Sequence, residues 1–529
     1  MQKSAYARRG MVVAPHHLAA QAGLAVLRSG GDAIEAMIAT SATLAVVAPH
    51  LGGLGGDAYW LISEPGKPPM AIEAAGAAGR AVSPDLYRKH HLGEIPARGP
   101  LAANTVAGMV SGWSSALAIS RGWGGRLPLR RWLEEAIGHA RDGVPMSAGL
   151  VQALADTAKD LSAHPGFKRI FLTSGHQPQP GTVLIQAALA KTLERLAAAG
   201  PDDFYRGELA KIITSELKTS GSPITAADLA EHWARLVEPL SVRLSDATLY
   251  NLPPPTQGLT ALMILGIFDR LAVTEGDSAF HIHALIEAGK HACRVRDLYV
   301  TDPFYMWAEA KDFLLPELLD EVAAVIGPDQ TQPWTDAGGH GTSAWLGAID
   351  AAGRTVSYMH SLHWSFGSGL ALEGSGVVWH NRGMSFSLNP SAVNHLISGR
   401  KPYHTLSPAL AVFNDGRVMA FGGMSGENQP QSQAALYSRY ARFGQSLQQA
   451  VSAPRWYLGR RHGTGTATLK LENRVSPQIA ETLRQSGHTL ELVEPFSPLM
   501  GDAGAVVHRP SGTLEGASDP RSDGSVAAW

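Results

Sequence analysis

Two adjacent hydroxyl side chains, Thr342 and Ser343, lie where a polar loop runs into an apolar stretch that predicts a β-strand. The loop before them, residues 327–341, is rich in Gly, Pro, Asp, Gln and Thr, which is typical of an exposed segment. A hydroxyl held at such a position can attack a carbonyl carbon when a base removes its proton. Because most Gly-Thr-Ser segments are simple turns, the neighbouring motifs decide whether this one carries chemistry.

Several motifs follow this pair in a regular order. Asp350 comes seven residues after Ser343 and begins a glycine turn. Further along the chain come a Phe-Gly-Ser-Gly corner, an Asn-Arg-Gly-Met-Ser-Phe-Ser segment, a Thr-Leu-Ser-Pro segment and a glycine-rich loop, at residues 366–369, 381–387, 405–408 and 421–431. Each motif alone is compatible with an ordinary turn or cap, so the information lies in their order.

This succession resembles the catalytic subunit of the γ-glutamyltransferase family. In that family a Thr begins a strand, and an Asp with a Gly, a Phe-Gly-x-Gly corner, an Asn-x-x-x-x-Phe-Ser segment and a late glycine-rich loop follow. Earlier and later motifs match as well, so that the resemblance covers essentially the whole chain: residues 30–36, 52–56, 140–143, 253–258 and 516–521. It implies an α+β fold of the four-layer αββα N-terminal-nucleophile type, with two central antiparallel sheets between helical layers.

The resemblance also implies the nucleophile. Counted back from Asp350, the family's catalytic Thr falls on Ser343, which implies self-cleavage between Thr342 and Ser343. Residues 1–342 would then form a large subunit and residues 343–529 a small one, within one αββα unit. The new N-terminus carries an α-amine with a pKa of about 7.7–8.0, which can serve as the general base. Thr342 stays open as the alternative nucleophile.

Three further catalytic residues follow from the resemblance. Ser361 falls where the family keeps a second hydroxyl that hydrogen-bonds the nucleophile, although an ordinary strand serine is nearly as good an interpretation. Ser425 and Gly426 fall on the family's oxyanion loop, where two backbone N–H groups face the developing negative charge.

The substrate-binding positions differ from those of the transferases. The family's carboxylate-binding Arg is here Ala75, and the acid that receives a substrate α-amine is here Ser385. The remaining pocket positions carry His363, Arg382, His404 and Thr405. A buried ammonium would lack its partner, whereas Arg382 adds a forked donor for an anion, unless it forms a structural ion pair. We therefore expect a small, anionic acyl amide as substrate, as in family branches similar to oxamate amidohydrolase and the cephalosporin acylases.

The elements that must position these residues change in kind along the chain. Apolar residues at three-to-four spacing predict helices over residues 17–29, 32–47, 182–199, 204–220, 225–233 and 258–271. Short β-type stretches follow beyond residue 340, at residues 344–349, 355–362, 409–413 and 418–421. Asn414-Asp-Gly416 between the last two predicts a hairpin. We expect a helix-rich first part and a sheet-rich second part.

The composition argues against several other classes of protein. The 44 Lys and Arg residues against 46 Asp and Glu residues leave no basic surface for nucleic acid or lipid, so a small-molecule partner is expected. The single cysteine, Cys293, excludes an intramolecular disulfide and is expected to be a buried hydrophobe. No secretory signal or membrane-length apolar stretch is recognisable, and we expect a cytoplasmic protein. No metal and no other cofactor is expected.

Two other functions stay open from the sequence. One is a true γ-glutamyltransferase or glutathione hydrolase with a rearranged pocket, which release of glutamate from a γ-glutamyl anilide would favour. The other is a catalytically silent homologue that keeps the fold for binding, which failure of the purified protein to cut itself would favour. The sequence leaves open whether the acyl group passes to water or to another acceptor, and whether the two-subunit unit dimerises further.

Overall fold

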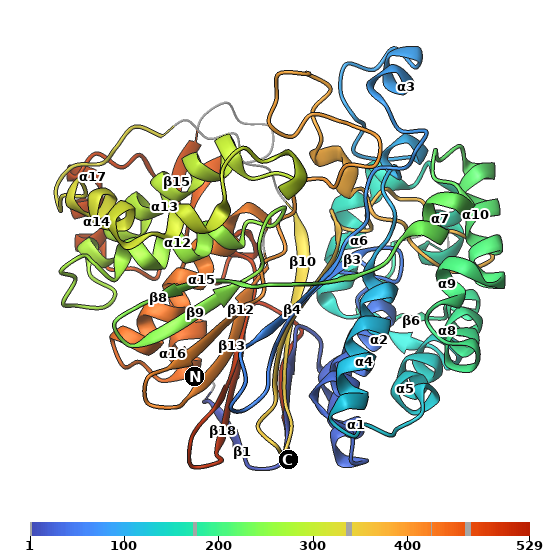
Figure 1. The fold of residues 1–529 in the computed structure, drawn as a ribbon, viewed down its shortest axis with the longest axis horizontal. Coiled ribbons are helices and arrows are strands. Elements are labelled where there is room, and N and C mark those ends of the chain that lie inside the picture. Colours follow the sequence, from blue (N-terminus) through green and yellow to red (C-terminus); the bar gives the residue numbers. More distant parts are fainter. Residues whose placement is uncertain (1–2, 173–176, 335–340, 425, 461–466) are drawn as a thin grey trace.

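Two seven-stranded sheets stacked face to face form the centre of the molecule, and helices cover both outer sides (Figure 1). The computed structural model describes residues 3–529 except 173–176, 335–340, 425 and 461–466. All pairings between the described strands of these two sheets are antiparallel. The predicted αββα architecture is therefore confirmed.

The first sheet carries the segment that begins at the expected cut. Its strands, in spatial order, are β19 (Ser525–Ala528), β2 (Met11–Ala14), β10 (Thr342–Ile349), β11 (Thr355–His363), β3 (Asp57–Ser63), β4 (Met70–Ala74) and β7 (Arg235–Val237). The neighbouring strands β10 and β11 lie in the interior of this sheet, between β2 on one side and β3 on the other. Strands from before and after the expected cut thus pair with each other in one sheet.

The second sheet packs against the first through a shared apolar layer. Its strands, in spatial order, are β1 (Ala5–Ala7), β18 (Leu514–Ser518), β17 (Ala503–His508), β13 (Val418–Gly423), β12 (Ala409–Phe413), β9 (Ala247–Asn251) and β8 (Leu240–Arg243). Smaller sheets contain β5 (Val144–Pro145), β6 (Val183–Leu184), β14 (Trp456–Arg460), β15 (Ala467–Glu472) and β16 (Leu490–Val493).

Trp345 of β10 fills much of the space between the two sheets. A side chain at Gly422 would place its Cβ 2.1 Å from the indole ring, and one at Gly504 would place it 2.6 Å away. The indole nitrogen donates a hydrogen bond to the Ser357 hydroxyl, 3.0 Å away. Since Trp345 lies two residues after Ser343, this packing holds the start of β10 in register with both sheets.

Helices from the first part of the chain cover the first sheet, and later helices cover the second (Figure 1). The first group comprises α1 (His17–Arg28), α2 (Ala33–Val47), α3 (Pro84–Lys89), α4 (Met109–Gly122), α5 (Leu129–Asp142), α6 (Ala148–Leu161), α7 (Pro165–Phe171), α8 (Ala187–Ala199), α9 (Asp203–Arg206), α10 (Glu208–Ser220) and α11 (Ala226–Glu231). The second comprises α12 (Gly258–Phe268), α13 (Ala279–Tyr299), α14 (Pro316–Ala324), α15 (Gln429–Tyr437), α16 (Leu447–Ser452) and α17 (Pro477–Gln485). None of the described helices is both long enough and apolar enough to cross a membrane.

Several local predictions are confirmed. The Asn414-Asp-Gly416 turn joins the antiparallel strands β12 and β13. The helix predicted over residues 225–233 is α11, which begins with a capping box formed by Thr225 and Asp228. Cys293 is buried in α13. The helix predicted over residues 204–220 is instead two helices, because the chain turns at Gly207 between α9 and α10.

The first part of the chain is rich in helices and the second in strands, as predicted, but the first part also supplies strands to both sheets. Residues before 342 supply β2, β3, β4 and β7 of the first sheet and β1, β8 and β9 of the second. Every residue of β2 and β3 is buried, so these strands have two covered faces. A strand covered on both faces lacks the alternation of polar and apolar residues that identifies a strand in a sequence.

Candidate active site

Ser343 lies at a β-bulge at the beginning of β10. Thr342 pairs with His363 and Ala344 with His360, so two residues of β11 lie opposite the single residue Ser343. A bulge re-aims side chains and is common beside active sites. The Ser343 side chain is buried, and its Oγ accepts a hydrogen bond of 2.9 Å from Nε2 of Gln429.

The peptide bond expected to break lies against Ser361. The Ser361 hydroxyl donates a hydrogen bond to the carbonyl oxygen of Thr342 and accepts one of 2.6 Å from the backbone N–H of His363. The sequence predicted a bond from Ser361 to the nucleophile, whereas in the uncut chain the bond goes to the neighbouring carbonyl. A donor at this oxygen polarises the carbonyl that Ser343 would attack.

The side chain of Thr342 has different surroundings. Its hydroxyl lies 3.2 Å from the Ser365 hydroxyl, whereas Gln429 donates its hydrogen bond to Ser343. Geometry therefore favours Ser343 over Thr342 as the nucleophile.

Gly426 of the expected oxyanion loop lies directly against the segment that precedes the cut. Its φ is +56°, and a Cβ there would lie 2.4 Å from the backbone nitrogen of Gly341. Gln257 fixes the loop, because its Nε2 donates hydrogen bonds of 2.8 Å to the carbonyl oxygens of both Gly426 and Thr405. Ser425, the other predicted oxyanion residue, lies outside the described residues.

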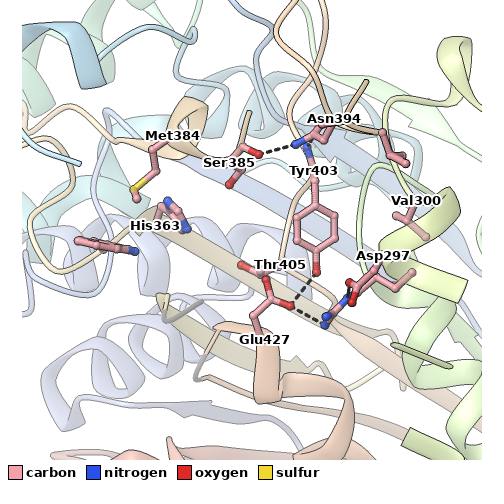
Figure 2. Close-up of a pocket in the computed structure, with 13 residues that line it drawn as sticks. Asp297, Val300, His363, Met384, Ser385, Asn394, Tyr403, Thr405 and Glu427 are labelled. Atoms are coloured by element: carbon pink, nitrogen blue, oxygen red, sulfur yellow. Dashed lines mark hydrogen bonds and ion pairs between the residues drawn. The ribbon is translucent and has the colours of Figure 1, made fainter. Parts of the chain in front are cut away.

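A cavity of about 430 Å³ has His363, the pairing partner of Thr342, in its wall. Three of the predicted substrate-binding residues line it: His363, Ser385 and Thr405. In Figure 2, His363 and Met384 lie on one side of the cavity, with Asp297 and Val300 on the opposite side. The remaining lining residues are Arg296, Trp364, Ala392, Val393, Asn394, Tyr403 and Glu427.

The two acidic residues of the cavity wall are both engaged by Arg296. Its Nη1 lies 2.5 Å from Oε2 of Glu427, and its Nε donates a hydrogen bond of 2.7 Å to Oδ1 of Asp297. The Tyr403 hydroxyl also donates to Glu427, over 3.3 Å. A substrate ammonium would have to compete with this guanidinium for either carboxylate.

Arg382 lies behind the cavity wall. Its guanidinium donates to the Thr405 hydroxyl over 2.9 Å, to the Ser385 hydroxyl over 3.2 Å and to the Tyr403 carbonyl over 3.4 Å. No carboxylate among the described residues forms an ion pair with Arg382, so the structure does not support a structural ion pair. Burial lowers the pKa of Arg382 to about 10, which leaves it protonated at neutral pH.

His404, also predicted to bind substrate, is buried and is not among the residues that line this cavity. Its Nδ1 accepts a hydrogen bond from the backbone N–H of Leu406, so Nε2 carries the hydrogen and donates to Asp57 over 3.2 Å. A motif match identifies a position but not the direction of its side chain. His404 therefore holds the backbone that presents Thr405 to the cavity.

Asp57 supports this wall and was not identified from the sequence. One of its carboxylate oxygens lies 3.2 Å from Nε2 of His404 and 3.3 Å from Nδ1 of His380, and the other accepts from the backbone N–H of Gly108 over 3.0 Å. The only sequence feature that could have identified Asp57 is its position directly after the glycine motif of residues 52–56.

Burial and charge set the protonation of this region. Burial alone would raise the pKa of Asp57, but His380 and His404 outweigh it and hold the pKa below its usual value. Burial, together with the charge of Arg382, lowers the pKa of His404 to about 3 and that of His363 well below its usual value. At neutral pH this region thus contains a charged Asp57 and neutral His363 and His404.

One group among the described residues has spacing suitable for a metal: His283 and Glu287 of α13 with His488. Nδ1 of His283 lies 2.8 Å from Nε2 of His488, and the Lys290 ammonium lies 2.7 Å from Glu287. A metal would have to displace both contacts. Glu287 also accepts from the backbone N–H of Gln332 over 2.9 Å, so the group anchors the segment leading to the expected cut.

The gamma-glutamyltranspeptidase family model, which describes the γ-glutamyltransferases, matches residues 19–529. The chain belongs to this family. Its predicted class, an N-terminal-nucleophile amide hydrolase made as a precursor, is thereby confirmed.

Full-length relatives specify the branch of the family. The chain is 47% identical to the oxamate amidohydrolase proenzyme of Klebsiella pneumoniae, over 100% of both chains. It is 36% identical to the glutathione hydrolase-like YwrD proenzyme of Bacillus subtilis, over 99% of both chains. The crystal structure of cephalosporin acylase from Bacillus halodurans superposes with a TM-score of 0.91 at 31% identity and covers 100% of this chain and 97% of that one. The predicted placement in the amidohydrolase and acylase-like branch is confirmed.

Proposed function

We propose that the chain cuts itself between Thr342 and Ser343 and then hydrolyses a small anionic acyl amide through an acyl-enzyme on Ser343. The expected substrate class rests on the surroundings of Arg382. Arg382 is a buried cation whose hydrogen-bond partners are neutral, directly behind two hydroxyls that line the cavity.

In the self-cleavage step, Oγ of Ser343 attacks the carbonyl carbon of Thr342. The Ser361 hydroxyl stabilises the charge that develops on the carbonyl oxygen. The Oγ proton passes to the amide nitrogen as the C–N bond breaks, the acyl group moves to Oγ as an ester, and the released nitrogen becomes the α-amine of Ser343. Water then hydrolyses the ester, which yields subunits of residues 1–342 and 343–529.

In turnover, the free α-amine takes the proton from Oγ of Ser343, which attacks the substrate carbonyl. The backbone N–H groups of Ser425 and Gly426 stabilise the oxyanion. The α-ammonium then gives its proton to the leaving amine as the amide C–N bond breaks. Water attacks the acyl-enzyme by the same route, and the acid is released.

The acyl part of the substrate carries a carboxylate that binds Ser385 and Thr405. Each hydroxyl accepts a hydrogen bond from Arg382, so its own hydrogen is available for an anion in the cavity. A hydrogen bond to a charged group contributes about 1.5–3 kcal/mol. Similarity to the oxamate amidohydrolase proenzyme supports a carboxylate-bearing acyl group.

An α-ammonium on the substrate is disfavoured because Arg296 already engages both acidic residues of the wall. This argues against a γ-glutamyl substrate, which carries such a group. The cavity volume of about 430 Å³ lies within the range of small-molecule sites. A substrate as small as oxamate would leave much of it to water, so larger acyl or amine parts can be accommodated.

The first experiment is a denaturing gel of the purified chain with N-terminal sequencing of its bands. The cleaved protein is then assayed with oxamate, a glutaryl amide and a γ-glutamyl amide. We expect an anionic amide without an α-amine to be hydrolysed best. A clear preference for the γ-glutamyl amide would instead support a γ-glutamyltransferase or glutathione hydrolase. A cytoplasmic location and further dimerisation stay predictions.

A further inference from the structure

The nucleophile has a buried side-chain partner that no motif assigned. We infer that Gln429 is an additional catalytic residue, whose amide donates a hydrogen bond to Oγ of Ser343 and stabilises negative charge there during attack and release. This inference rests on the proposed role of Ser343 as the nucleophile. Nε2 of Gln429 lies 2.9 Å from Oγ of Ser343, and both residues are buried.

A chain of hydrogen bonds fixes the orientation of the Gln429 amide. Nε2 of Gln433 donates to the backbone carbonyl of Ser407, an oxygen that can only accept. The same Nε2 lies 3.4 Å from the Ser407 hydroxyl, whose hydrogen is thus directed to Oε1 of Gln429 over 3.2 Å. With its oxygen occupied as an acceptor, the Gln429 amide presents its NH₂ group to Ser343.

The placement of Gln429 on a helix makes this contact rigid. Gln429 is the first residue of α15, and Gln433 follows one turn later on the same face. α15 packs against α12 and β13, so its first turn is fixed to the second sheet. Functional groups on rigid elements hold their geometry better than groups on loops.

The donor acts on the oxygen that changes charge in the reaction. As the α-amine removes the Oγ proton, negative charge grows on Oγ until the bond to the acyl carbon forms. It grows again when the ester bond breaks in deacylation and Oγ leaves. A neutral amide donor stabilises both charge-bearing states without exchanging a proton, so the α-amine stays the only base.

The test replaces the amide with groups of similar length. Gln429→Met removes the donor, and Gln429→Glu replaces it with a carboxyl group that donates only when protonated. Gln431→Met is the matched control, because Gln431 is buried on the same helix and, within the described part of the chain, its hydrogen bonds of 3.1 and 3.2 Å go to the backbone of Leu458. Thermal unfolding of each variant separates loss of folding from loss of chemistry.

For Gln429→Met we expect slower self-cleavage and a kcat about 10- to 100-fold lower in the cleaved fraction, with KM unchanged. Gln431→Met should keep the wild-type kcat once folded. For Gln429→Glu, activity relative to wild type should rise as the pH falls, because the protonated carboxyl group regains a donor. A purely structural role would not produce this pH dependence.

Wild-type kcat in Gln429→Met, or the same loss of kcat in Gln431→Met, would overturn the inference. So would a Gln429→Glu variant whose activity relative to wild type does not change with pH. A Ser343→Ala chain that still cuts itself would instead refute the proposed nucleophile, which is a separate outcome.

Discussion

The hydroxyl of Ser361 donates a hydrogen bond to the carbonyl oxygen of Thr342, the oxygen that becomes negative when Ser343 attacks. The backbone of Gly426 meanwhile lies against Gly341, two residues before the cut. Different donors therefore serve the two reactions we propose: a side chain for self-cleavage and a backbone loop for substrate turnover.

Ser361→Ala should slow self-cleavage, because the scissile carbonyl loses its donor. Loss of one oxyanion donor typically costs about 10²–10³ in rate. The time course of subunit appearance on a denaturing gel measures it. Ser357→Ala is the control, since Ser357 is buried on the same strand but bonds the Trp345 indole. Self-cleavage of Ser361→Ala at the wild-type rate would refute this role.

Ser343→Ala should leave a single full-length band, because no hydroxyl remains to accept the acyl group. Thr342→Ala should still cut, since its hydroxyl faces Ser365 and becomes only part of a new C-terminus. N-terminal sequencing of the small subunit decides between the two residues. A small subunit that begins at residue 342 would show that Thr342 is the nucleophile.

Ser425→Gly should retain most activity, because the proposed oxyanion contact uses backbone N–H groups. Gly426→Pro should lose about 10²–10³ in turnover, since proline removes the donor. The φ of a proline, about −65°, is also incompatible with the φ of +56° found at Gly426. The measurement is kcat of the cleaved fraction of each variant. Equal, mild losses would place the oxyanion hole elsewhere.

Arg382→Met should raise KM for an anionic amide more than for a neutral amide of equal size, with a loss of about 1.5–3 kcal/mol in binding. Arg400→Met is the matched control, because Arg400 is also buried and donates to neutral oxygens, but none of its described hydrogen bonds goes to the hydroxyls of Ser385 or Thr405. Arg382→Lys should restore binding only in part, since an ammonium cannot bond both hydroxyls as a fork does. Equal KM changes for both amides would contradict the proposed anion site.

Activity should rise with pH through about 7.7–8.0, because the α-amine of Ser343 must be unprotonated to act as base. No second change is expected near pH 6.5, since burial and Arg382 hold the pKa of His363 well below that value. The pH profile of kcat/KM measures both points. His363→Asn should leave the position of the rise unchanged, whereas a shift would identify His363 as a titrating group.

The family resemblance predicted the layered fold and the positions of His363, Ser385 and Thr405, because motif order reports which loops meet. It could not predict which way a side chain points. His404 and Arg382 match substrate-binding positions, yet His404 bonds Asp57 and Arg382 lies behind the hydroxyls. Gln429 was part of a recognised motif, but only tertiary packing brings it to Ser343.

The central strands of the molecule come from both sides of the proposed cut. β10 pairs with β2, and β11 pairs with β3, across antiparallel ladders inside one sheet. The two product chains would therefore share one hydrophobic core, and neither buries its strands without the other. Folding must therefore precede cutting. Unfolding after the cut would separate the two subunits, which are no longer covalently linked, so refolding would require two chains to associate. The stability of the mature protein would then be kinetic, because it depends on a slow rate of unfolding. Its half-life at a given temperature therefore describes its stability better than a free energy of unfolding does.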